Sequence, residues 1–167
     1  MLRRALIFVP VIVISGLLIG VLSNNGFSNE YYSPLEKPAF QPPGWAFGVA
    51  WTLLYAMMGI ALAVVLDAPG RPRRRGAIAL FAGQLGLNFA WSPAFFGLGM
   101  IDVGLLIIGA MIVLLTLTII AFSRIRALAG ALLLPYLAWL CLAAALNFET
   151  GRLNPGADKA PLGITGA

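Results

Sequence analysis

Five runs of apolar residues limit what this chain can fold into. They cover about residues 5–22, 45–66, 76–96, 103–122 and 127–148. A helix of about 20 residues crosses the hydrocarbon core of a bilayer, which is about 30 Å thick. Inside lipid every backbone N–H and C=O group needs a partner within the protein, and a helix supplies these partners within one segment. We therefore predict an all-α membrane protein, a bundle of five transmembrane helices.

The residues between and after these runs form loops and a tail. Residues 23–44 are polar, aromatic and rich in proline. A connection of about 20 residues is long beside a median of about 4 to 6, and such loops often close over a binding site. We expect residues 23–44 to be a lid, residues 1–153 to be one transmembrane domain, and residues 154–167 to be a disordered tail.

The composition argues against several classes of function. The net charge is +5, and the chain has no histidine and one cysteine, Cys141. The arginines lie in short segments between apolar runs, which indicates topology signals and no nucleic-acid partner. Without histidine the usual general base, haem ligand and most zinc sites are missing, and one cysteine builds no metal cluster. We predict no metal site, no cofactor and no conventional hydrolytic chemistry.

Positive residues are unequally divided between the two ends of the predicted bundle. Positive residues in short loops favour the cytoplasmic side. One end has Lys37, Arg152 and Lys159. The end with the N-terminus has Arg3, Arg4, Arg71, Arg73, Arg74, Arg75, Arg124 and Arg126. We predict an integral multi-pass membrane protein whose N-terminus is cytoplasmic.

Three of the predicted helices carry aromatic and amide side chains along one face. Residues three or four apart share a face of a helix. The three faces are Phe47, Trp51, Tyr55 and Met58, then Gln84, Asn88, Trp91 and Phe95, and finally Tyr136, Trp139, Ala143 and Asn147. Two interpretations stay open. The faces either pack the helices together through interhelical hydrogen bonds, or they line a pocket for a large, flat, apolar ligand.

Small residues recur at spacings that bring helices close together. Gly16 and Gly20 form a GxxxG pattern in the first run. The third run has two further series, Ala79 with Gly83, and Ala82 with Gly86 and Ala90. Such residues allow close contacts between helices, either within the bundle or between protomers.

Three blocks of residues between about Tyr31 and Asn154 form a specific pattern. The blocks are Leu35, Lys37, Pro38, Pro42, Pro43, Trp45, Trp51, Leu54, Tyr55, Met58 and Gly59, then Gly83, Gln84, Leu85, Leu87, Asn88, Ala90, Trp91, Pro93, Phe95, Phe96 and Gly97, then Pro135, Tyr136, Leu137, Ala138, Trp139, Leu146 and Asn147. On these residues the chain resembles the translocator protein family, also called tryptophan-rich sensory proteins or peripheral-type benzodiazepine receptors.

The resemblance implies a five-helix bundle, commonly a homodimer in membrane lipid. It also implies that porphyrins such as protoporphyrin IX, sterols and benzodiazepine-type ligands bind in a pocket closed by the first loop. Trp51 and Trp139 match two pocket tryptophans that some members use in porphyrin breakdown, and Ala143 matches a position where a bulkier residue weakens binding. Together with the faces above, the expected ligand-binding residues are Phe47, Trp51, Tyr55, Gln84, Asn88, Trp91, Phe95, Trp139, Ala143 and Leu146. The expected lid residues are Tyr31, Tyr32, Pro38, Phe40 and Pro42.

The chain departs from the family pattern at two positions. Phe40 stands where relatives often have tryptophan. Leu146, Phe148 and Arg152 approach the proposed sterol pattern of branched, aromatic and basic residues, but Phe148 replaces its tyrosine. The resemblance therefore supports porphyrin binding more than sterol binding.

Three functions fit the predicted pocket or its surroundings. The first, which we favour, is transport or sensing of a tetrapyrrole without catalysis. The second is breakdown of a bound porphyrin by light and oxygen, in which Trp51 and Trp139 would be the reactive residues. The third is a scaffold that regulates tetrapyrrole metabolism through the arginine-rich loop at residues 71–75.

Overall fold

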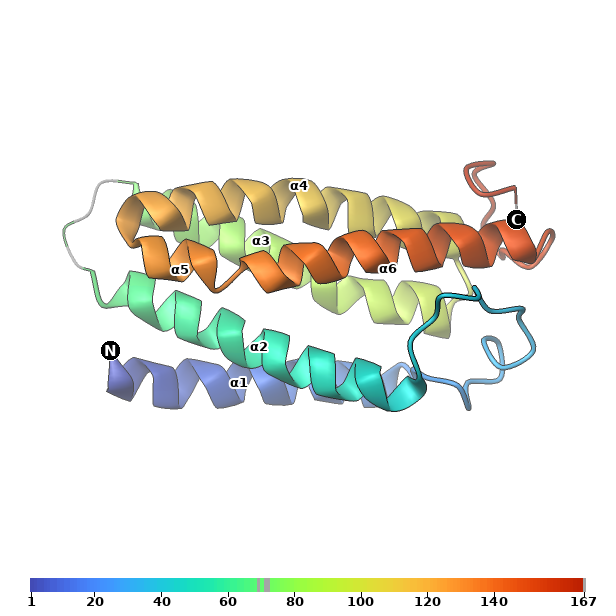
Figure 1. The fold of residues 1–167 in the computed structure, drawn as a ribbon, viewed down its shortest axis with the longest axis horizontal. Coiled ribbons are helices and arrows are strands. Elements are labelled where there is room, and N and C mark those ends of the chain that lie inside the picture. The colour runs from blue at the N-terminus through green and yellow to red at the C-terminus, as the bar shows by residue number, and fades with distance from the viewer. Residues whose placement is uncertain (69, 71–72, 167) are drawn as a thin grey trace.

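The computed structural model describes residues 1–68, 70 and 73–166, and within them it is helical without strands. Figure 1 shows the long helices side by side along one axis. The loop predicted as a lid (residues 23–44, the lid loop) and the C-terminal segment (residues 154–166) lie at the same end. The elements are α1 (Leu2–Leu22), α2 (Gly44–Leu66), α3 (Arg74–Ser92), the π-helical turn η1 (Pro93–Gly97), α4 (Ile101–Ile125), α5 (Ala127–Ala131) and α6 (Leu134–Leu153).

Four segments of the described chain are long and apolar enough to cross a membrane. They are Leu2–Leu22, Gly44–Leu66, Ile101–Ile125 and Ala127–Leu153. The remaining long helix, α3, begins with two arginines and carries the amides of Gln84 and Asn88, which lower its hydropathy. The structure therefore supports an all-helical membrane protein with four clear candidate spans.

Pro93 and Pro135 mark the two places where the third and fifth apolar runs depart from one continuous α-helix. The third run ends as an α-helix at Ser92, and Pro93 opens a π-helical turn closed by a bond from Leu98 N to Pro93 O (2.9 Å). The fifth run is broken, because Pro135 lies in the first turn of α6 rather than inside a continuous helix. A proline lacks the N–H that an interior helix position must donate, and the first turn needs no such bond.

The C-terminal segment also differs from its prediction, because residues 154–166 fold against the start of α4. The Asp158 carboxylate accepts hydrogen bonds from the N–H groups of Ile101 (3.1 Å) and Asp102 (2.8 Å). The first N–H groups of a helix have no partner inside the helix, so this carboxylate caps α4. The composition of residues 154–167 gives no sign of this cap, because the N–H groups that Asp158 binds lie more than 50 positions earlier in the sequence.

The Asp102 side chain completes this docking from the other direction. It is fully buried, and its two oxygens are the acceptors for the segment that follows Asp158. Its donors are the N–H groups of Leu162 (2.8 Å), Ile164 (3.0 Å) and Thr165 (3.0 Å) and the hydroxyl of Thr165 (2.6 Å). A buried carboxylate with four hydrogen bonds is well satisfied, whereas the same group without them would be costly to bury.

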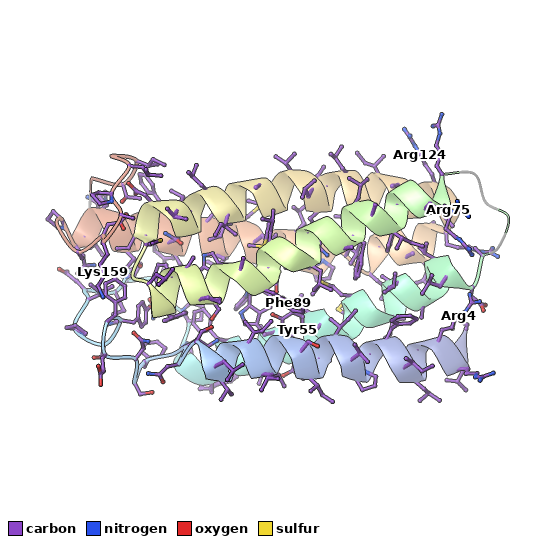
Figure 2. The ribbon with its side chains drawn as sticks, turned by 180° about the vertical axis from the view of Figure 1, so that it is seen from behind. Arg4, Tyr55, Arg75, Phe89, Arg124 and Lys159 are labelled. Atoms are coloured by element: carbon purple, nitrogen blue, oxygen red, sulfur yellow. The ribbon has the colours of Figure 1, made fainter. Side chains whose placement is uncertain are left out.

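Most of the arginines gather at the end of the bundle opposite the lid, whereas Arg152 lies in the last turn of α6. Figure 2 shows Arg4, Arg75 and Arg124 at this end and Lys159 at the other. The Met1 ammonium donates to the Asp67 carboxylate (2.7 Å), which joins the start of α1 to the end of α2. This hydrogen bond lowers the pKa of the Asp67 carboxyl. Arg71, one of the arginines predicted for this end, lies outside the described residues.

Helix α1 packs closely against α2, and glycines make this contact possible. Gly16 faces the ring of Tyr55, so the GxxxG pattern of α1 serves a contact within the bundle. A Cβ atom on Gly59 would lie 2.6 Å from the Cα of Val9, a backbone atom that cannot turn aside. The distance between α1 and α2 is therefore limited by contact between their backbones as well as by side-chain packing.

Replacing Gly59 with alanine is expected to lower the midpoint of thermal unfolding in detergent. The added methyl group must push α1 away from α2, at a cost of about 1–3 kcal/mol. Gly48→Ala on the same helix is the control, because its Cβ would meet no atom within 4 Å. That control should unfold at the same temperature or higher, since alanine is the better helix former. Equal midpoints for both variants would contradict the close α1–α2 contact.

Candidate ligand-binding cavity

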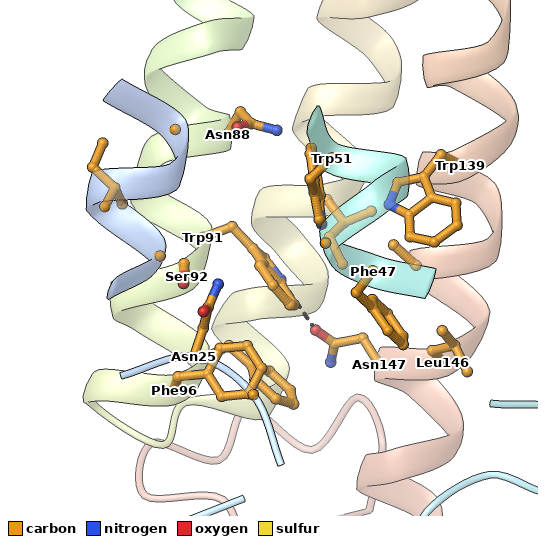
Figure 3. A pocket seen from close by; sticks show the side chains of 18 of the residues that line it. Asn25, Phe47, Trp51, Asn88, Trp91, Ser92, Phe96, Trp139, Leu146 and Asn147 are labelled. Atoms are coloured by element: carbon orange, nitrogen blue, oxygen red, sulfur yellow. Dashed lines mark hydrogen bonds between the residues drawn. The ribbon is translucent and has the colours of Figure 1, made fainter. Parts of the chain in front are cut away.

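A cavity of about 540 Å³ lies among α1, α2, α3, η1, α4 and α6, at the end of the bundle covered by the lid loop. Figure 3 shows aromatic side chains from different helices pointing into it. Its lining is mainly apolar, with a small number of amides and hydroxyls. Size and lining both match those of a small-molecule site.

One wall of the cavity is a group of aromatic rings on α2 and α6. The Trp51 ring stacks on Tyr55 with centroids 5.2 Å apart, and it meets Trp139 edge to face at 6.4 Å. Phe47 contacts Trp139 in the same manner at 5.6 Å. Helical spacing places Phe47, Trp51 and Tyr55 on one face of α2, so the sequence pattern itself builds this wall.

Trp91 and Phe95 build the opposite side of the cavity. Their rings stack with centroids 5.1 Å apart. The indole Nε1–H of Trp91 donates to Asn147 Oδ1 (3.3 Å), and Asn147 Nδ2 donates to the Ile101 carbonyl (2.9 Å). Figure 3 shows the first of these bonds. The bonds hold the indole plane at one orientation, because each partner is itself anchored on a different helix.

Asn88 connects three helices at the inner end of the cavity. Its Oδ1 accepts a hydrogen bond from the Tyr55 hydroxyl (2.8 Å), and its Nδ2 donates to the Tyr136 hydroxyl (2.7 Å). All three side chains are buried. Such a network is satisfied only in one arrangement of α2, α3 and α6, so it specifies the packing of the cavity floor.

The lid loop lines part of the cavity with Asn25, Gly26, Phe27, Tyr32 and Gln41, and Tyr32 makes the aromatic contacts to the opposite side. Its ring meets Phe95 and Phe96 edge to face, with centroids 5.9 and 5.2 Å away. The Tyr32 hydroxyl donates to Gln41 Oε1 (2.9 Å), which joins two parts of the loop. Burial raises the pKa of the Tyr32 hydroxyl. The hydroxyl therefore remains a hydrogen-bond donor near neutral pH.

The C-terminal segment holds the outer side of the lid. Asn154 exchanges two hydrogen bonds with the backbone of Glu36, at 2.7 and 2.9 Å. The Tyr31 hydroxyl donates to the Ala157 carbonyl (3.1 Å), and the Lys159 ammonium lies 5.1 Å from the centre of the Tyr31 ring. Burial and the nearby Asp158 carboxylate raise the pKa of Tyr31 to about 12. The tail thus bridges the lid and the end of α6.

The predicted site residues divide into those that line the cavity and those that do not. Gln84 lies outside the lining, one turn deeper than Asn88, where its Nε2 is 3.8 Å from the Met58 sulfur. Of the five residues predicted to form the lid, Tyr32 lines the cavity. The other predicted residues in the lining are Phe47, Trp51, Tyr55, Asn88, Trp91, Phe95, Trp139, Ala143 and Leu146, whereas Tyr31, Pro38, Phe40 and Pro42 are not in it.

Some lining residues had no clear signal in the sequence. Helix α4 contributes Ile108 and Met111, which are ordinary apolar residues of a membrane helix. Helix α1 contributes Gly16 and Gly20, whose spacing indicated a close contact but no cavity. The lining residue Gln41 belongs to none of the sequence patterns, because loop residues lack the periodicity that marks a helix face.

Comparisons with known proteins agree with the resemblance seen in the sequence. The model of the TspO/MBR family matches residues 8–153. The tryptophan-rich protein TspO of Chlorobaculum tepidum is 43% identical over 126 residues, which are 75% of this chain and 80% of that protein. The tryptophan-rich sensory protein of Cereibacter sphaeroides is 39% identical over 126 residues, covering 75% and 78%. The translocator protein of Homo sapiens is 35% identical over 146 residues, covering 84% and 85%. The chain therefore belongs to the TspO/MBR family.

Proposed function

We propose that this membrane protein binds a tetrapyrrole of the protoporphyrin IX type in the lid-covered cavity, and that it transports or senses this ligand. The observation that carries the proposal is the cavity of about 540 Å³ with the indoles of Trp51 and Trp139 on one wall. Aromatic faces stack on flat conjugated rings. The Cereibacter sphaeroides relative is named a sensory protein, which agrees with a sensing role.

The proposal includes the arrangement of the protein in its membrane. We infer that α3 crosses the bilayer as a fifth span beside α4, with its amides turned toward the bundle. The arginines at one end support a cytoplasmic N-terminus. A homodimer is supported by the outer side of α3, where a Cβ on Gly76 or Gly86 would meet no atom within 4 Å.

Breakdown of the bound porphyrin is a second candidate function. Trp51 stacks on Tyr55, whose hydroxyl bonds to Asn88, so an oxidisable indole at the cavity wall is backed by hydrogen-bonded phenols. The scaffold interpretation uses the arginine-rich loop, of which residues 71 and 72 lie outside the described residues, so it stays a prediction. We do not extend the proposal to sterols, since Leu146 lines the cavity while Phe148 is exposed on α6.

A titration of protoporphyrin IX into the purified protein in the dark tests the proposal. Porphyrin absorbance should show saturable binding, and Trp51→Phe with Trp139→Phe should weaken it by about two- to tenfold, because a phenyl ring still stacks on the porphyrin but covers less apolar area than an indole. Trp45→Phe is the control, since Trp45 is 73% exposed and lies outside the cavity lining. Binding no stronger than detergent partitioning would overturn the proposal.

Illumination of the same samples separates the two candidate functions. Bleaching of bound porphyrin that requires Trp51 or Trp139, with binding retained, would favour breakdown. Stable bound porphyrin would favour transport or sensing. The Trp45→Phe protein should behave as the unchanged protein in either case.

A further inference from the structure

We infer that the ligand enters and leaves the cavity from the bilayer, through a side opening between the end of α1 and the start of α2, while the lid end stays closed. The inference rests on the proposed function, because it assumes that a tetrapyrrole occupies the cavity. Three observations support it: where the exposed lining residues lie, how α1 and α2 separate there, and how differently the lid end and this side are held.

The exposed residues of the cavity lining all lie at one place. A residue that belongs to the wall of a cavity and is also exposed marks a point where the cavity meets its surroundings. The lining residues of α3, η1, α4 and α6 are buried or half-buried. The exposed ones come from the end of α1, the first part of the lid loop and the start of α2, and they are Leu17, Val21, Asn25, Phe27, Gly44 and Gly48. The cavity therefore opens between α1 and α2.

Helices α1 and α2 touch along most of their length and separate beside the lid loop. The backbones meet where Gly59 lies against Val9, and Gly16 lies against the ring of Tyr55. Nearer the lid loop, a Cβ atom on Gly48 would meet no atom within 4 Å. Glycine thus leaves a space beside α2 that a larger side chain would fill.

The ring of Phe27 lies at the edge of this side opening. A Cβ atom on Gly44 would be 2.9 Å from the ring, so the ring rests on the first residue of α2. The ring also meets Tyr32 edge to face, with centroids 5.9 Å apart. Phe27 is 46% exposed, and exposed side chains change rotamer within nanoseconds. The ring is therefore a movable cover.

Hydrogen bonds hold the lid end of the cavity much more firmly. Asn29 Nδ2 donates to the Phe96 carbonyl (3.3 Å), which joins the lid loop to η1. The Lys37 ammonium donates to three carbonyls of the loop. The two bonds between Asn154 and Glu36 join the loop to the end of α6. A route through the lid end would have to break several of these bonds.

The side opening is bordered by apolar contacts instead. Within the part of the chain that the structure describes, no hydrogen bond joins residues 17–22 to residues 44–48. Leu17 and Val21 belong to α1, one of the segments that are apolar enough to cross a membrane. Apolar rings dissolve in lipid tails, so a path from there into the cavity never exposes them to water.

The depth of the side opening also suits the carboxylates of a porphyrin. Helix α1 has 21 residues and is about 31 Å long, close to the hydrocarbon thickness of about 30 Å. Val21 lies in its last turn and is 75% exposed, so the side opening reaches the edge of the hydrocarbon core. Charged groups can stay among the lipid headgroups there while the rings enter the cavity.

The test measures the association and dissociation rates of protoporphyrin IX in the dark, with the protein in lipid nanodiscs. Gly48→Leu fills the side opening, so both rates should fall by about fivefold or more. A substitution that only weakened the bound state would raise the dissociation rate instead. Phe27→Ala removes the movable cover and should raise the association rate by about twofold or more.

Gly109→Leu is the matched control for added bulk. Gly109 is an exposed residue of α4 outside the cavity lining, and its Cβ would also meet no atom within 4 Å. Both rates should equal those of the unchanged protein. If Gly48→Leu likewise left both rates unchanged, the inference would be overturned.

Asn154→Ala tests the lid end as the alternative route. It removes both hydrogen bonds to Glu36, and both rates should stay the same. Faster association in this variant would show entry through the lid, which would overturn the inference and leave the proposed function in place. If the unchanged protein bound no porphyrin saturably, the proposed function itself would fail.

Discussion

Asp102→Ala is expected to release the C-terminal segment and to destabilise the protein by about 3 kcal/mol. The buried carboxylate is the acceptor for three backbone N–H groups and one hydroxyl of residues 162–165. Hydrogen bonds to a charged group contribute about 1.5–3 kcal/mol each, but the freed segment regains contact with water and chain entropy. The net loss is therefore smaller than the sum of four bonds. Hydrogen exchange of residues 159–166 and thermal unfolding in detergent measure the two effects.

The same variant should also loosen the lid. Asn154 bonds to Glu36, and Ala157 accepts from Tyr31, so the segment that Asp102 anchors is the outer support of residues 31–36. Exchange in these residues should rise with that of the tail. Asp67→Asn is the control, because the Asp67 carboxylate is exposed at the far end of the bundle. Protected tail amides in Asp102→Ala would show that the carboxylate does not hold the segment.

Asn88→Leu should lower stability by about 2–4 kcal/mol. The leucine has a similar volume, but it leaves the buried hydroxyls of Tyr55 and Tyr136 without the amide between them. An unsatisfied buried donor or acceptor costs about 1–3 kcal/mol, and two hydroxyls are affected. Tyr136 retains a weak contact to the Met111 sulfur (3.7 Å), which reduces the loss on that side. The midpoint of thermal unfolding reports the change.

A triple variant separates hydrogen bonding from packing at the same position. Tyr55→Phe and Tyr136→Phe, added to Asn88→Leu, remove both hydroxyls that the single variant leaves unpaired. Replacing all partners by apolar groups of similar shape is nearly neutral. The triple variant should therefore be more stable than Asn88→Leu alone. If it were less stable, the cost of Asn88→Leu would come from packing instead of the lost hydrogen bonds.

The sequence determined the features that depend on local chemistry and short spacing. Apolar runs located the long helices, and spacings of three and four residues placed Trp51, Asn88 and Trp139 on the faces that meet at the cavity. The side chains of one helix face point the same way regardless of the partner, so this information is present in the sequence alone. The pattern did not separate Gln84 from Asn88, which are one turn apart on one face. Only the depth of the cavity decides which of them reaches it.

The tertiary structure decided everything that depends on pairs of residues far apart in the chain. The order of the tail comes from Asp102 and Asp158, which cap and anchor each other's segments across more than 50 positions. The pairing of Asn88 with the hydroxyls of Tyr55 and Tyr136 is likewise visible only when all neighbours are in place. Periodicity shows which face of a helix a residue occupies. Whether a buried polar group finds a hydrogen-bond partner depends on which residues of other segments lie beside it.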